Sequence, residues 1–419
     1  MRSFIFGLGT LATLVLSSLV GAGCSSGGGA RIDGAQDDAG TAEPVDAATP
    51  SADAIANASD ASPSGDGAAQ DASPDAVTGA SGLAPVESRA IQALTTACVN
   101  APTDYGPYGA IASYDRYELV NPAWAGSATP MPVQIFVPKG GASTHPVIFF
   151  SHPYGGNDYR RMLGLIEAMV SHDDIVVFTP YATLQTSVCG RYDTLWGGFQ
   201  TAIDVLGAHV GADTTRVGFF GHSFGGGATP WIAHQAIKVR GWGSAGSFLF
   251  ASAPWYVYRM AAADWNDFPA GSRLTAMVYA DDPVNDHRMA IDEVWGPFPR
   301  SKGYVRLVSA DHGACKLVAD HGSPQCAAQY DTFDALDSWG VWRHFAAIEA
   351  CTLRGDATAC TIADGTSAAT TAMGTWTSDG TAVPPAERPS APTPSKASSA
   401  YTFPIDKESQ YPCSGAKGG

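Results

Sequence analysis

The chain has 419 residues, which is enough for one large domain together with terminal extensions. Its formal net charge of −16 argues against nucleic-acid binding, because neutralising phosphates needs clustered Lys and Arg. The segment 25–95 holds eleven acidic residues against two basic ones, so the rest of the chain is only mildly acidic.

The first residues have the pattern of an export signal. Arg2 precedes an apolar run from Phe4 to Val20, which predicts a secretory signal peptide over residues 1–24. The run Leu19-Val20-Gly21-Ala22-Gly23-Cys24 resembles a bacterial lipobox, although Gly21 replaces the usual Leu. The resemblance implies that Cys24 is lipidated, that the lipid anchors the protein to a membrane, and that Ser25 directs it to the outer membrane or cell surface. Secretion or a periplasmic location is the alternative.

Residues 25–95 consist mainly of Ala, Asp, Ser, Gly and Pro, with almost no large apolar side chains. Such a segment buries too little surface to offset the entropy of ordering. We therefore expect a disordered tether over 25–95. Residues 361–419 are rich in Ala, Thr, Ser and Pro, which predicts a low-complexity, loosely ordered tail.

Between these extensions, residues 96–360 alternate apolar strands with helical spacing. Strands are predicted at 114–120, 132–137, 146–151, 174–179, 217–220, 247–252, 274–280 and 304–310, and helices at 157–170, 195–210 and about 327–350. Apolar strands separated by helices indicate a mostly parallel sheet covered on both faces. We therefore predict an α/β fold with a mostly parallel central sheet flanked by helices on both faces. The segment after Pro254 contains Trp255, Tyr256, Tyr258 and Trp265, which are typical either of a pocket wall or of ordinary packing.

Cysteine usage fits an exported protein, in which disulfides can form. Seven cysteines remain beyond Cys24, and their close spacings suggest the pairs Cys315–Cys326 and Cys351–Cys360. Cys98, Cys189 and Cys413 would leave one residue free, and the spacing does not decide which. No Cys-x-x-Cys or Cys/His ligand spacing occurs, so we expect no zinc site and no other metal.

The central motif is Gly221-His222-Ser223-Phe224-Gly225, which matches G-x-S-x-G and follows an apolar strand. In this pattern the serine lies on a sharp turn between a strand and a helix, and its hydroxyl is exposed for attack. A second match at 23–27 lies in the signal region, with no strand before it. Pro230 falls inside the predicted helix and should kink it.

A serine nucleophile needs a base and a carboxylate that orients the base. In folds that carry the G-x-S-x-G turn, the acid follows the serine in the sequence and the histidine follows the acid. The acid is expected after the strand 274–280, where Asp282 is favoured over Asp281 and then Asp286. The base is expected after the strand 304–310, where His312 stands directly at the predicted strand end. His321 is the alternative base, whereas His152 and His222 are assigned to structural packing and His287 and His344 to surface or core positions.

An oxyanion hole needs two preorganised N–H groups, one of them from the residue after the nucleophile. Phe224 supplies the first. Tyr154 is the best candidate for the second, because Pro153 has no N–H group. The alternative for residues 151–156 is an ordinary glycine-rich turn.

Four stretches together resemble the α/β-hydrolase superfamily over residues 100–350: His152-Pro153-Tyr154-Gly155-Gly156, Gly221 to Gly226, Asp282-Pro283-Val284 and Asp311-His312. Within it, they are similar to the branch of cutinase-like polyesterases, chlorophyllases, dienelactone hydrolases and platelet-activating-factor acetylhydrolases. Pro153 departs from the Gly that is common in relatives. The resemblance implies a cofactor-free serine hydrolase acting on small-molecule, lipid or polymer esters. An amidase or peptidase on the same fold, or an inactive surface binding module, are the rival hypotheses.

Overall fold

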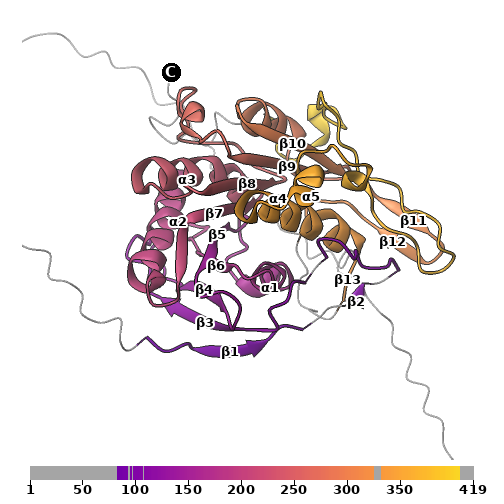
Figure 1. Ribbon diagram of the computed structural model, residues 1–419. Helices are drawn as coiled ribbons and strands as arrows, with labels where there is room; N and C mark the ends of the chain where they lie inside the picture. Colours follow the sequence, from indigo (N-terminus) through magenta and orange to yellow (C-terminus); the bar gives the residue numbers. More distant parts are fainter. Residues whose placement is uncertain (1–82, 93–94, 97, 107, 325–331, 406–419) are drawn as a thin grey trace, which may run out of the picture. The chain divides into compact units, whose positions relative to one another are not determined.

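The computed structural model describes residues 83–92, 95–96, 98–106, 108–324 and 332–405 (Figure 1). The predicted signal peptide, Cys24 and the tether up to residue 82 lie outside the described residues. Order begins earlier than predicted, because β1 (Glu87–Ala90) already pairs with β3 (Ser113–Leu119). No helix among the described residues combines the length and apolar character needed to cross a bilayer.

The centre of the structure is a nine-stranded sheet in the order β1-β3-β4-β6-β5-β7-β8-β9-β10. Strands β5 to β10 pair in parallel, whereas β1, β3 and β4 run antiparallel to their neighbours. The remaining strands of this sheet are β4 (Val133–Pro138), β5 (His145–Ser151), β6 (Ile175–Phe178), β7 (Ala212–His222), β8 (Gly246–Ser252), β9 (Arg273–Tyr279) and β10 (Ser301–Leu307). The prediction of an α/β fold with a mostly parallel sheet is confirmed.

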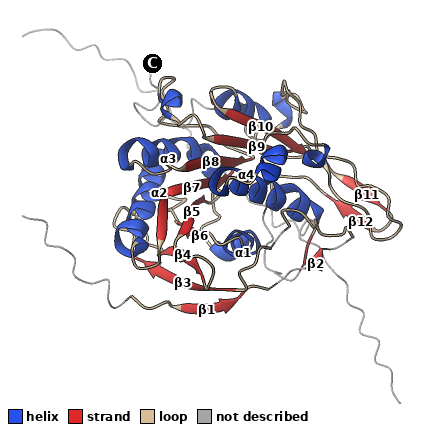
Figure 2. Cartoon of the chain, in the orientation of Figure 1, coloured by secondary structure: helices blue, strands red, loops and turns tan. Residues whose placement is uncertain are grey.

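Two apolar cores lie on the two faces of the sheet, and β5 shows how the sequence divides them. Ile148 and Phe150 point to the face that α1 (Leu163–Ser171) and α4 (Arg343–Arg354) cover. Val147 and Phe149 belong to the core on the face that α2 (Val188–Ala202) and α3 (Phe224–Arg240) cover. Figures 1 and 2 show where these helices lie relative to the sheet. Because every second side chain faces the same way, a strand buried on both faces must be apolar throughout.

Short elements connect these layers. They are 3-10 helices η2 (Tyr159–Met162), η4 (Asp264–Asp267), η7 (Ala368–Thr371) and η8 (Ser398–Ala400), π-helical segments η3 (Ile203–Gly207), η5 (Met289–Trp295) and η6 (Leu336–Trp342), α5 (Ala357–Ala363), and strands β2 (Thr95–Thr96), β11 (Ala310–His312), β12 (Cys315–Leu317) and β13 (Thr332–Phe333). The first residues of the predicted helix 327–350 lie outside the described residues. Helix α3 continues through Pro230 to a left-handed C-cap at Gly241, so the proline does not end it.

The C-terminal segment is packed as far as Ile405, against the prediction of a loosely ordered tail. Its sparse large side chains are buried, among them Trp376, Val383 and Tyr401. Trp376 packs with the core that contains α1 and α4. A few well-placed apolar residues and backbone pairing therefore order a segment whose composition alone indicates disorder.

Two disulfides are formed between described residues. Cys351–Cys360 confirms the prediction and links α4 to α5. Cys315 pairs with Cys98 across 217 residues, so the predicted Cys315–Cys326 pair is wrong. The reason is that Cys315 lies on β12 of a two-stranded hairpin whose position brings it to the N-terminal segment. Cys189 is also disulfide-bonded. These bonds indicate an extracytoplasmic, oxidising environment for the domain.

Candidate active site

Ser223 lies at the turn between β7 and α3, in a backbone conformation that side chains rarely adopt. Its φ of 54° and ψ of −120° are outside the ordinary regions for a non-glycine residue and cost about 1–3 kcal/mol. Three backbone hydrogen bonds hold the turn: Ser223 N donates to Ser252 O at 2.9 Å, and Ser223 O accepts from Trp255 N at 2.8 Å and from Gly227 N at 3.1 Å. The strained turn places Ser223 directly after the C-terminal end of β7, where the residue is 7 % exposed.

Two glycines of the motif are required by close packing. A Cβ atom at Gly221 would collide with the carbonyl of Gly225, and one at Gly225 would collide with the carbonyl of Ser151 at the end of β5. The turn therefore sits directly against the neighbouring strand. This explains why glycine occupies positions 221 and 225, two residues before and two residues after the serine.

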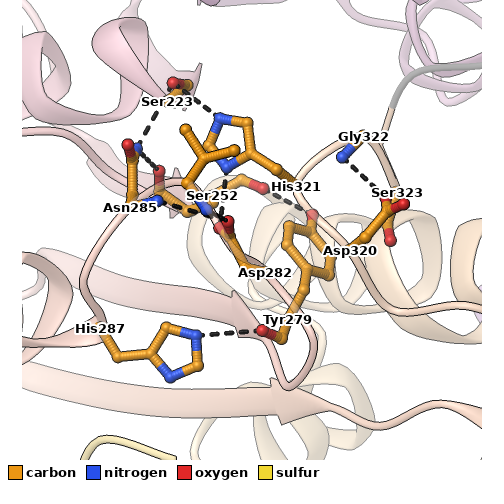
Figure 3. Close-up of polar contacts among 12 residues, drawn as sticks. Ser223, Ser252, Tyr279, Asp282, Asn285, His287, Asp320, His321, Gly322 and Ser323 are labelled. Atoms are coloured by element: carbon orange, nitrogen blue, oxygen red, sulfur yellow. Dashed lines mark hydrogen bonds and ion pairs between the residues drawn. The ribbon is translucent and has the colours of Figure 1, made fainter. Parts of the chain in front are cut away.

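His321 and Asp282 complete a chain of hydrogen bonds with this serine (Figure 3). His321 Nε2 lies 2.9 Å from Ser223 Oγ, and His321 Nδ1 lies 2.7 Å from Asp282 Oδ2. In the tautomer with its proton on Nδ1, directed at the aspartate, Nε2 can accept the hydroxyl proton of the serine. The three residues come from the ends of β7, β9 and the segment after β12, far apart in the sequence.

The structure corrects the choice of histidine. His312 is not beside Ser223: its Nε2 lies 2.9 Å from Asp379 Oδ2, and its ring stacks on Trp376 at 5.1 Å. Strand β10 ends at Leu307, three residues before the predicted end, and the chain then forms the β11–β12 hairpin, which carries His312. The chain returns to the sheet only after β12, so the alternative base, His321, is the one that reaches the serine.

Asp282 occupies the place predicted for the acid, and its two rivals are engaged elsewhere. Its side chain is fully buried, and its Oδ1 accepts hydrogen bonds from Val284 N at 2.6 Å and Asn285 N at 3.3 Å. Asp281 accepts from Ser309 Oγ, and Asp286 pairs with Arg288. Only Asp282 therefore presents an oxygen to His321 among these three carboxylates.

His152 and His222 are packed, as predicted, and His287 and His344, predicted at surface or core positions, are buried as well. Burial keeps the pKa of His222 well below its ordinary value, and its ring lies 4.9 Å from that of His321. Burial lowers the pKa of His152 to about 3, and its Nε2 accepts from Tyr181 N at 3.1 Å. Burial also lowers the pKa values of His287 and His344 to about 4. These rings are neutral and serve as fixed hydrogen-bonding groups.

Phe224 and Tyr154 are the two residues whose N–H groups are predicted to bind an oxyanion. Phe224 is the first residue of α3, whose N-terminal N–H groups have no partner within the helix. Tyr154 lies in the loop after β5, next to the turn in which Gly156 N donates to Pro153 O at 2.9 Å. Within the described part of the chain, no acceptor bonds to the N–H of Phe224 or of Tyr154. The Tyr154 ring is half exposed, and its hydroxyl donates to Thr183 O at 3.0 Å.

A C-terminal strap, residues 395–405, covers the loop that carries Asp282, residues 281–288. Backbone bonds from Thr402 N to Pro283 O and from Phe403 N to Val284 O measure 2.7 and 2.9 Å. Further contacts join the two segments: Lys396 to the Asp282 carbonyl, Ser395 to His287, Ser398 to Asp286, and the Asn285–Phe403 bridge. The strap thus holds the loop that carries Asp282, a contact that the sequence did not reveal.

Among the described residues, one cluster has the composition of a metal site. His234, Asp264 and Asp267 offer ligand atoms within 4.8 Å of one another. Asp267 is already paired with Lys238 Nζ at 3.1 Å and with His234 Nε2 at 3.0 Å. An ammonium group therefore already neutralises the carboxylate that a cation would need. His234 also lies about three helical turns along α3 from Ser223.

Neither protein-family models nor curated protein sequences gave a match to this chain. The fold and the site together define an α/β protein with a Ser–His–Asp chain of hydrogen bonds at the C-terminal edge of its parallel strands. Sites in such folds lie at this edge.

Proposed function

We propose that this protein is a serine hydrolase of the α/β-hydrolase type that cleaves carboxylic esters through an acyl-enzyme. The observation that supports the proposal best is the continuous chain Ser223 Oγ–His321 Nε2, His321 Nδ1–Asp282 Oδ2, at 2.9 and 2.7 Å on a strained turn. A strained backbone at a serine has a cost in stability, and such strain persists where the function requires it.

The chemistry follows from the geometry. Ser223 Oγ attacks the ester carbonyl carbon as its proton moves to His321 Nε2, and the carbonyl electron pair moves onto oxygen. The N–H groups of Phe224 and Tyr154 would stabilise that oxyanion. Collapse of the intermediate expels the alcohol, which takes the proton from His321. Water, deprotonated by the same imidazole, then releases the acid and regenerates Ser223. Asp282 keeps the ring oriented and stabilises its positive charge.

The test compares His321, which contacts Ser223, with His312, which contacts Asp379 instead. Ser223→Ala and His321→Ala should each lower kcat on p-nitrophenyl butyrate by about 10⁴- to 10⁶-fold. His312→Ala, which removes a solvent-accessible ring paired with Asp379, should stay within about twofold of the wild type. Retention of wild-type turnover by Ser223→Ala would refute the proposal. A matching series of p-nitroanilides separates ester from amide cleavage.

We also propose that the protein is an exported lipoprotein anchored through Cys24. The disulfides of the domain support export. Metabolic labelling with a radioactive fatty acid should mark the wild type and not Cys24→Ala. Equal labelling of the two proteins would refute the anchor without touching the enzymatic proposal.

A further inference from the structure

Asn285 lies beside the nucleophile and belongs to none of the roles assigned so far. Its side chain is buried, and its Nδ2 lies 3.4 Å from Ser223 Oγ (Figure 3). Ser223 Oγ therefore has two polar neighbours, the His321 imidazole and the Asn285 amide. The distance to the amide is long for a hydrogen bond to a neutral hydroxyl, but bonds to an oxygen that gains negative charge are shorter and stronger.

The orientation of the amide is fixed by its surroundings. Nδ2 also donates to Ala253 O at 2.8 Å. A rotated amide would place Oδ1 against that carbonyl, so the nitrogen must face Ala253 and Ser223. Oδ1 is buried and has no hydrogen-bond donor within the described residues. The residue therefore keeps an incompletely satisfied amide in order to place a donor at this position.

The backbone of Asn285 is held as firmly as its side chain. Asn285 N donates to Asp282 Oδ1 at 3.3 Å, and the residue pairs with Phe403 of the C-terminal strap. One residue thus contacts the acid through its backbone and the nucleophile through its side chain. A preorganised donor needs no rearrangement when charge develops, which is when it has the greatest effect.

We propose that Asn285 is a further catalytic residue, whose Nδ2–H group stabilises negative charge on Ser223 Oγ; this rests on the proposed hydrolase function. In acylation, Oγ loses its proton to His321 Nε2 and forms the bond to the carbonyl carbon. In deacylation, the Oγ–carbon bond breaks and Oγ takes the proton back from His321. Charge builds up on Oγ in both steps, and the amide donates a hydrogen bond throughout without transferring its own proton.

The experiment measures the reaction of Ser223 with a fluorophosphonate probe and the steady-state kinetics of p-nitrophenyl butyrate in the full chain. Asn285→Ala should lower the second-order rate of phosphonylation and kcat by about 10- to 100-fold. KM should stay within about twofold, because the amide faces Oγ. Asn285→Asp should be slower than Asn285→Ala, since a carboxylate repels the developing charge. Asn285→Leu fills the volume without a donor and should match Asn285→Ala.

Asn121→Ala is the matched control, because Asn121 is equally buried and donates to the backbone carbonyl of Thr194. It should lower Tm but leave the phosphonylation rate of the folded protein unchanged. The inference is overturned if Asn285→Ala and Asn285→Leu label within threefold of the wild type, or if Asn285→Asp labels as fast as Asn285→Ala. Failure of the wild type itself to react with the probe would instead overturn the hydrolase proposal.

Discussion

A buried pair of carboxylates at the edge of the sheet opposite the site should make stability fall as pH rises. Glu349 on α4 and Asp174, just before β6, are both fully enclosed and share the single guanidinium of Arg354, at 2.8 Å in each case. Burial raises the pKa of Glu349 to about 7, and burial also raises the pKa of Asp174, with the charge of Glu349 as a further cause. One cation cannot compensate two desolvated anions, so the pair retains a proton near neutral pH.

The sign follows from proton binding. Between the ordinary carboxyl pKa of 4.5 and about 7, the folded state holds a proton that the unfolded state has lost. The free energy of unfolding therefore decreases as pH rises through this window. For Glu349 the full effect is about 3 kcal/mol by pH 8, at 1.36 kcal/mol per pKa unit. Glu349→Gln, which is uncharged at every pH, should remove most of this slope.

Urea unfolding followed by tryptophan fluorescence from pH 4.5 to 8.5 measures the effect. The wild type should lose about 3 kcal/mol more than Glu349→Gln across this range. Glu118→Gln is the control, since Glu118 is an exposed carboxylate paired with Arg116 on the sheet surface. Parallel pH profiles for wild type and Glu349→Gln would refute the argument, as would an equally flattened profile for Glu118→Gln.

Three further outcomes are expected. Cys315→Ser breaks the long-range disulfide and should lower the free energy of unfolding by about 5 kcal/mol, whereas Cys360→Ser breaks the short one and should lower it by about half as much. The difference arises because the two disulfides close loops of very different length. Equal urea midpoints for the two variants would contradict this. Ser223→Gly should be about 1 kcal/mol more stable than Ser223→Ala in thermal unfolding, since glycine accepts the positive φ; a less stable glycine variant would show that the turn is not strained. Tyr401→Ala removes a buried ring of the strap whose centroid lies 5.3 Å from that of His287, and it should lower the free energy of unfolding by about 3 kcal/mol and also lower kcat. An unchanged kcat would show that the strap does not influence Asp282.

The predictable parts of the molecule are those in which local pattern and topology agree. The apolar runs at β5, β7 and β8 have no second interpretation, and the G-x-S-x-G motif specifies a turn that only glycine neighbours permit. Asp282 could be chosen because it follows β9 almost directly. In each case the residues that decide the structure are adjacent in the chain.

The structure brings His321, the second choice, to Ser223 in place of His312, because the path of this segment depends on a distant partner. A rule that takes the first histidine after a strand assumes that the strand ends where its apolar run ends. Here the chain leaves the sheet after Leu307, and the pairing of β11 with β12 and the bond to Cys98 hold the excursion away. The glycine in His312-Gly313-Ala314-Cys315 could have indicated a hairpin turn, because glycine readily adopts the positive φ that such turns need. In the structure Gly313 has a φ of 61°. The partner of Cys315 and the strap both depend on contacts between remote segments, which spacing cannot supply.

The strap has a consequence for biosynthesis. A ribosome delivers Ser223, Asp282 and His321 well before it delivers residues 395–405, which pair with the loop 281–288. A polypeptide released before residue 395 would carry all nine strands of the sheet, yet it would lack the backbone bonds from Thr402 and Phe403 to the loop that carries Asp282. The strap is therefore the last of these segments to leave the ribosome, and its bonds to the loop 281–288 can form only after it has done so.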